Sequence, residues 1–185
     1  MPKRKKKKEE EYSFLSIAVE NYEISCDTSI NLSLRQERPM FYNEDDLAYE
    51  FITSLDISGT CISPSDRKGD RIELKIRGCE RHAGEFSATL KDFQKRGEYG
   101  SPVYKEYRGE QYPVHNPPPG IALFDKRRGE PIWDCWLWVA PRLVSDMLIL
   151  LTQKSGLYIS IHEKKIKRQR WVQNFSLRTV DPEME

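Results

Sequence analysis

The chain has 185 residues, of which 38% are hydrophobic and 32% charged, with 30 lysines and arginines against 29 aspartates and glutamates. This length allows one globular core that needs no disulfide or metal, and the even charge balance excludes a domain that is basic throughout. The apolar runs, such as Met147 to Leu151, are far shorter than the roughly 20 residues of a transmembrane helix.

The N-terminus is strongly charged. Lys3–Lys8 holds six of the basic residues, and Glu9–Glu11 stands where a secretory signal would have an apolar stretch. We therefore expect residues 1–11 to be a disordered tail on an intracellular protein, cytoplasmic, or nuclear in a eukaryotic cell. The tail is a nuclear-import signal, a solubilising end or a phosphate-binding arm. In the last case its candidate residues are Lys3, Arg4, Lys5 and Lys6.

The first elements after the tail are extended. Apolar and polar residues alternate from Ile24 onward, as in a strand with one wet face. Residues 12–20 and 22–35 are predicted as two extended segments, followed by a connection over 36–49. A short helix beginning near Asn43 is an alternative within that connection.

The next stretch predicts a hairpin with one apolar face. Its alternating residues are Leu55, Ile57, Cys61, Ile72, Leu74 and Ile76, on either side of turn residues at 63–70. Directly opposed residues share a face, so pairing Ile57 with Leu74 also pairs Asp56 with Lys75. A further strand is expected at Phe86, Ala88 and Leu90.

Glycines and prolines interrupt any periodicity over 94–119, and a loop of this length is usually functional or disordered. The loop interleaves tyrosines with basic residues, as protein interfaces and single-strand stacking surfaces do. The candidate partner-binding residues are Tyr99, Tyr104, Lys105, Tyr107, Arg108 and Tyr112.

Two further hairpins and one helix complete the pattern. Residues 121–124 and 132–139 form the second hairpin, whose later strand is apolar on both faces and therefore belongs in a covered sheet. Its tryptophans, Trp133, Trp136 and Trp138, are assigned with Trp171 to the core rather than to a sugar-stacking surface. The element expected to cover this sheet is a helix predicted over 141–154, with Pro141 at its first position. Alternation of Leu148, Leu150 and Thr152 leaves a strand as the alternative.

The third hairpin spans 157–161 and 171–177 around a basic turn, and residues 181–185 are expected to fray. About nine or ten strands with one helix predict a mainly β fold. The expected architecture is two packed antiparallel sheets, a sandwich, in one domain over 12–180.

Basic residues recur in the hairpin turns. If the turns gather at one end of the sandwich, they form a rim that contacts phosphates; singly, each is explained as a solvated tip. The residues are Arg67 and Lys68, then Lys126, Arg127 and Arg128, and then Lys164, Lys165, Lys167, Arg168 and Arg170.

A nuclease-like constellation is the one catalytic candidate. Glu73 and Lys75 have the E-x-K form in which a carboxylate holds a divalent cation and a lysine steadies phosphate or water. The hairpin register puts Asp56 diagonal to Glu73 at roughly 7 Å, although it also sets Asp56 against Lys75 as an ordinary ion pair. The four cysteines lie far apart without a CxxC, so they are expected in the core, and neither a metal site nor a cofactor is predicted.

These features predict a non-enzymatic interaction module that needs no membrane. It would bind a protein partner through the Tyr-rich loop and contact nucleic acid through its tail and basic turns. The alternative is a metal-dependent nuclease that uses Asp56, Glu73 and Lys75. The sequence determines neither the partner nor the oligomeric state.

Overall fold

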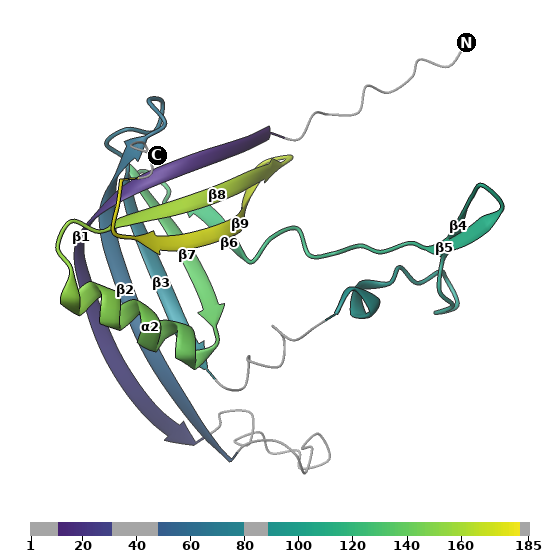
Figure 1. Cartoon of the computed structure of the whole chain (residues 1–185), viewed down its shortest axis with the longest axis horizontal. Helices are drawn as coiled ribbons and strands as arrows, with labels where there is room; N and C mark the ends of the chain where they lie inside the picture. Colours follow the sequence, from purple (N-terminus) through teal and green to yellow (C-terminus); the bar gives the residue numbers. More distant parts are fainter. Residues whose placement is uncertain (1–10, 31–47, 80–88, 182–185) are drawn as a thin grey trace.

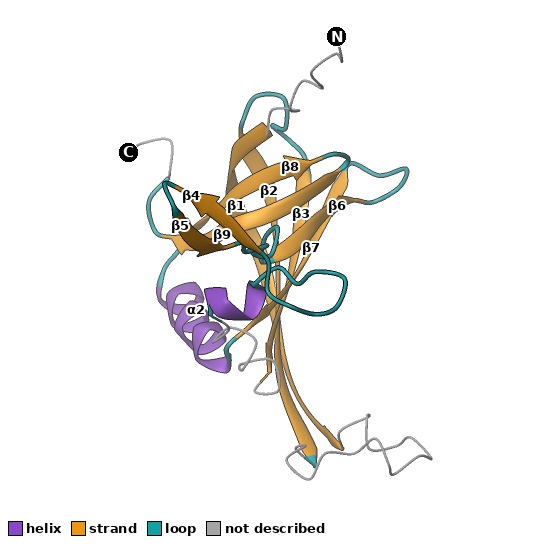
Figure 2. Ribbon diagram, turned by 90° about the vertical axis from the view of Figure 1, so that its right-hand side faces the viewer, coloured by secondary structure: helices purple, strands orange, loops and turns teal. Residues whose placement is uncertain are grey.

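The computed structural model describes residues 11–30, 48–79 and 89–181. Seven strands form a closed barrel in the order β1-β2-β3-β7-β6-β9-β8, in which β3 and β7 are parallel and the other neighbours antiparallel (Figure 1 and Figure 2). Their bounds are β1 Glu11–Ile30, β2 Tyr49–Ser63, β3 Arg71–Cys79, β6 Ala122–Lys126, β7 Ile132–Val139, β8 Tyr158–Ile166 and β9 Gln169–Arg178. The prediction of a mainly β fold is confirmed, and the prediction of a two-sheet sandwich is wrong.

The barrel closes through β1. Its first part pairs with β8 from Glu11 to Ala18, and its later part pairs with β2 as far as Ile30. One long strand therefore joins the two ends of the sheet. The predicted break between 12–20 and 22–35 is wrong, because an irregularity between Val19 and Asn21 continues the strand instead of ending it.

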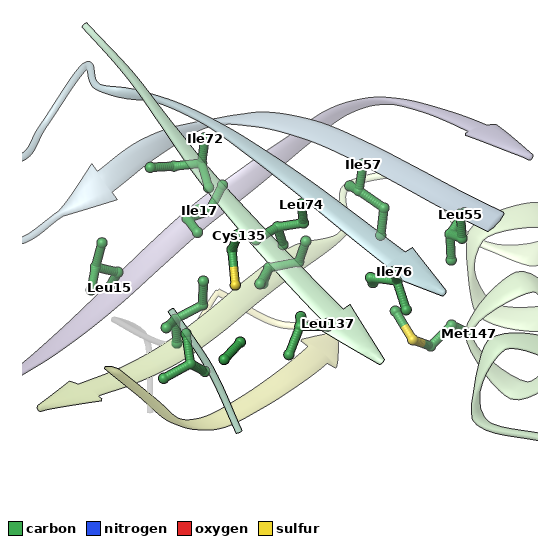
Figure 3. Packing of buried hydrophobic residues seen from close by; sticks show 14 of the residues in the cluster. Leu15, Ile17, Leu55, Ile57, Ile72, Leu74, Ile76, Cys135, Leu137 and Met147 are labelled. Atoms are coloured by element: carbon green, nitrogen blue, oxygen red, sulfur yellow. The ribbon is translucent and has the colours of Figure 1, made fainter. Parts of the chain in front are cut away.

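The β2–β3 hairpin has the predicted register, with Ile57 opposite Leu74 and Asp56 opposite Lys75. Inward-facing apolar residues of these strands join those of β1 and β7 in one core inside the barrel (Figure 3). The alternation of side chains identifies this inner face, since it places every second residue on one side of a strand.

The predicted helix is confirmed as α2, Pro141–Gln153. It closes the end of the barrel at which β3 and β7 finish, and it buries Val144, Met147 and Leu151 in the core. A side chain at Gly78 of β3 would meet Val144 at 2.8 Å, so this glycine allows the helix to approach. Among the described residues no helix is long and apolar enough to cross a membrane.

The helix does not cover the outer face of β7, which corrects the placement of two tryptophans. Trp136 is 52% exposed and Trp138 is 38% exposed, whereas Trp133 faces the core. The core assignment of Trp171 is also wrong, because this half-buried residue lies opposite Lys164 in the outward row and is not part of the core. The four cysteines are free, and Cys26 is exposed rather than buried. Burial raises the pKa of Cys61 to about 11 and that of Cys135 to about 12, so both thiols are protonated at neutral pH.

The described part of the connection between β3 and β6, which begins at Thr89, lies away from the barrel (Figure 1). It contains a 3-10 helix, η4 (Leu90–Phe93), and an antiparallel hairpin, β4 (Tyr104–Tyr107) with β5 (Glu110–Pro113), which the sequence had suggested was only a loop. Leu90 starts η4 and not a strand. The expected helix near Asn43, the residues Phe86 and Ala88, the tail residues 1–10 and residues 182–185 lie outside the described residues, and Glu11 belongs to β1.

Candidate functional site

Three basic turns meet at one end of the barrel, opposite α2. β3 and β7 are parallel, so the β2–β3 and β6–β7 turns that precede them lie at the same end. β1 starts there too, because Ser16 pairs with Ser63 at the end of β2 and Glu11 pairs with Lys165 beside the β8–β9 turn. We call these three turns the basic end.

Side-chain contacts join the three turns. The Arg67 guanidinium lies 3.8 Å from the centroid of the Trp133 ring, and the Arg170 guanidinium lies 5.5 Å from it. Both arginines donate hydrogen bonds to the carboxylate of Glu163, which is 1% exposed and also accepts one from Ser13 at 2.6 Å. These contacts hold the turns together, and the Glu163 carboxylate neutralises part of their positive charge.

Other basic residues of the turns remain open to solvent. Arg127 is bound by Asp134 and Glu73, and these hydrogen bonds raise its pKa, while Lys165 pairs with Glu11. The exposed basic side chains that make no ion pair with the described residues are Lys68, Lys126, Arg128, Lys167 and Arg168. Lys3, Arg4, Lys5 and Lys6 lie outside the described residues.

The Tyr-rich segment forms a hairpin away from the barrel (Figure 1). We call residues 94–115 the Tyr hairpin. All eight residues of β4 and β5 are exposed, and the Arg108-Gly109 turn has positive φ at both positions, as a two-residue type I′ turn requires. Backbone hydrogen bonds from Lys95 to Val114 and from Val114 to Val103 extend the pairing toward the barrel.

The hairpin divides the predicted binding residues between two faces. Lys105 is opposite Tyr112 and Tyr107 is opposite Glu110, so these four share one face, while Tyr104 lies on the other. The tyrosines are strongly exposed: Tyr99 92%, Tyr104 52%, Tyr107 60% and Tyr112 47%. The Arg108 guanidinium lies 5.2 Å from the Tyr107 ring centroid, which adds a cation to the first face.

The nuclease candidates do come together. Asp56, Glu73 and Lys75 line a shallow hollow of about 200 Å³ on the outer face of β1, β2 and β3. Each carboxylate is bound by arginine: Asp56 by Arg77, and Glu73 by Arg127 at 2.9 Å. The described residues contain no group of three or more histidines, cysteines or carboxylates arranged to hold a metal ion. The arrangement therefore favours an ion-paired sheet surface over a cation site.

The sequence analysis missed an exposed aromatic group on β1 and β8. Tyr12 is 53% exposed and Phe14 is 62% exposed on the outer face of the barrel, where both lie against His162. The signal was weak because residues 12–19 are mostly apolar on both sides of the strand. The only sign was that the apolar residues of the other set, Leu15, Ile17 and Val19, are all aliphatic and therefore suit the core better.

The barrel was also compared with known proteins. No family model matches the chain, and neither the curated proteins nor the solved structures give a match. The function therefore has to be inferred from the surfaces that this chain itself presents.

Proposed function

We propose that the chain is a non-enzymatic interaction module that binds a protein partner through the Tyr hairpin. The observation that carries this proposal is an exposed two-stranded hairpin, set apart from the barrel, with tyrosines on both faces. An isolated two-stranded sheet gains little stability in water, and tyrosine supplies a large contact area at low rotamer entropy. A partner that covers one face would stabilise both the hairpin and the complex.

The face with Tyr107, Tyr112 and Lys105 is the better docking surface, because it holds two tyrosines flanked by cations. Replacing Tyr107 and Tyr112 by alanine should cost about 2–4 kcal/mol of partner affinity, as buried aromatic anchors of interfaces do. The partner is first identified by affinity capture from the native cell, and its affinity for each variant is then measured by titration calorimetry.

The matched control is Tyr104 on the opposite face. Tyr104→Ala should change affinity by less than about 1 kcal/mol, and none of the variants should shift the thermal midpoint appreciably, because all three rings are exposed. Equal losses from both faces would contradict a one-sided interface. A marked fall in thermal stability would instead show that these rings support the fold.

Nucleic-acid binding by the basic end is the second candidate function, favoured by the meeting of three basic turns at one end of the barrel. Phosphate contacts supply affinity without sequence preference and fall steeply with salt. Because the exposed cations come from three separate turns, their phosphate contacts would extend across the whole basic end and would not be confined to one β-strand. The nuclease alternative has less support, since arginines already neutralise Asp56 and Glu73.

Replacing Lys68, Arg128, Lys167 and Arg168 by glutamine should weaken duplex and single-stranded binding alike. The slope of log affinity against log salt should fall by about 0.7–0.9 for each lost phosphate contact. Arg142→Gln with Lys154→Gln, on and next to α2 at the other end, is the matched charge control. An unchanged slope in the fourfold variant would exclude the basic end as the phosphate surface.

A further inference from the structure

A strip of aromatic side chains runs beside the basic end on the outer face of β1 and β8. We call Tyr12, Phe14 and His162 the aromatic strip. We infer that this strip binds single-stranded nucleic acid by stacking bases on Tyr12 and Phe14, while the β8–β9 turn contacts the phosphates. This inference rests on the second candidate function and names its ligand.

The rings form one continuous surface. Phe14 is opposite His162 in the β1–β8 pairing, and the two rings stack with centroids 4.6 Å apart and planes inclined by 13°. The Tyr12 ring lies 5.6 Å from the same histidine. Tyr12 and Phe14 are two residues apart on one strand, roughly 7 Å, so each can take a different base.

Cations border the strip. Lys164 lies opposite Tyr12, with its ammonium 5.4 Å from the ring centroid. The chain then reaches the β8–β9 turn, where Lys167 and Arg168 are exposed. In the next strand Trp171 lies opposite Lys164. Lysine therefore separates an aromatic ring on β1 from one on β9, an alternation suited to bases between phosphates.

The two described rows of outward residues beside the rings carry no acidic side chain, and the exposed carboxylate of Glu11, next to Tyr12, is paired with Lys165. The outward positions of the two rows across β1, β8 and β9 are Tyr12, Lys164 and Trp171, then Phe14, His162 and Asn174, and none of these six is acidic. The nearby carboxylate of Glu163 points inward and is buried. A polyanion can therefore approach the rings without repulsion from these rows.

The combination of exposed rings and neighbouring cations favours unpaired bases over a duplex. Phe14 is 62% exposed although it stacks on His162, so part of its ring remains accessible to a base. The bases of a duplex are already stacked on each other, so a duplex would contact only the cations.

The experiment measures binding of the full chain to a fluorescein-labelled thymidine oligomer of about 12 nucleotides, by fluorescence anisotropy. Phe14→Leu should weaken this binding roughly tenfold, as expected for loss of one stacked base, and should leave affinity for a duplex of equal length within about twofold. Tyr12→Leu is the second variant, in case Phe14→Leu impairs folding. The control is Phe51→Leu, which removes a phenylalanine that is 57% exposed on β2, distant from the basic end.

Each outcome separates the inference from the function on which it rests. Equal loss of duplex and single-stranded affinity, or no loss from either ring variant, overturns stacking on the aromatic strip while the basic end remains a phosphate surface. Failure of the unmodified chain to bind either nucleic acid overturns both. Preferential binding to phosphatidylserine vesicles, reduced by Phe14→Leu, would assign the strip to a membrane surface and overturn the inference.

Discussion

Replacing Glu163 by alanine is expected to lower the free energy of unfolding by about 3–5 kcal/mol, the cost of leaving a buried charge without its partner. The carboxylate accepts hydrogen bonds from Ser13, Arg67 and Arg170 inside the end of the barrel. Arg67 is only 7% exposed, and one of its terminal nitrogens has no partner in the described structure even with Glu163 present. Without the Glu163 carboxylate, the remaining acidic contact of Arg67 is Asp70, at 2.8 Å.

Urea denaturation measures the free energy of unfolding of Glu163→Ala, and two further variants serve as comparisons. Glu11→Ala removes the exposed pair with Lys165 and should cost less than about 0.5 kcal/mol. Replacing Arg67 by methionine together with Glu163 by leucine removes both buried charges and should restore much of the stability. If Glu163→Ala costs no more than Glu11→Ala, the buried network does not hold the three turns together.

Replacing Gly59 by alanine is expected to cost about 3 kcal/mol, because the new methyl group would collide with backbone. An added Cβ would lie 2.2 Å from the carbonyl oxygen of Ala18 on β1. No side-chain rotation can relieve this contact, so β1 and β2 would have to separate next to the irregularity at Val19. This is where the closing strand bends, so the change should weaken closure of the barrel itself.

Thermal and urea unfolding of the two glycine variants provide the check. The control is Gly97→Ala in the Tyr hairpin, where the nearest atom to an added Cβ is 3.7 Å away, so the stability should change by less than about 0.5 kcal/mol. A similar loss at both positions would show that loss of glycine, and not the contact with Ala18, is responsible.

The Tyr hairpin and the aromatic strip show where prediction of the site was limited. The tyrosines at 99–112 could be found because they stand in a segment without an apolar period. Tyr12 and Phe14 could not, because Leu15 and Ile17 beside them are equally apolar and only packing decides which set faces water. Trp136 and Trp138 were assigned to the core for the same reason, yet α2 does not cover the outer face of β7.

The sequence by itself determined the β2–β3 register and the extent of α2, because both depend on periods and turn residues within a few positions of each other. Only the tertiary structure decided that the sheet closes, since the pairing of β1 with β8 and of β3 with β7 joins segments far apart in the chain. The same pairings bring the three basic turns to one end. Alternation indicates which residues of a strand share a face, but it does not indicate which distant strand will pair with that strand.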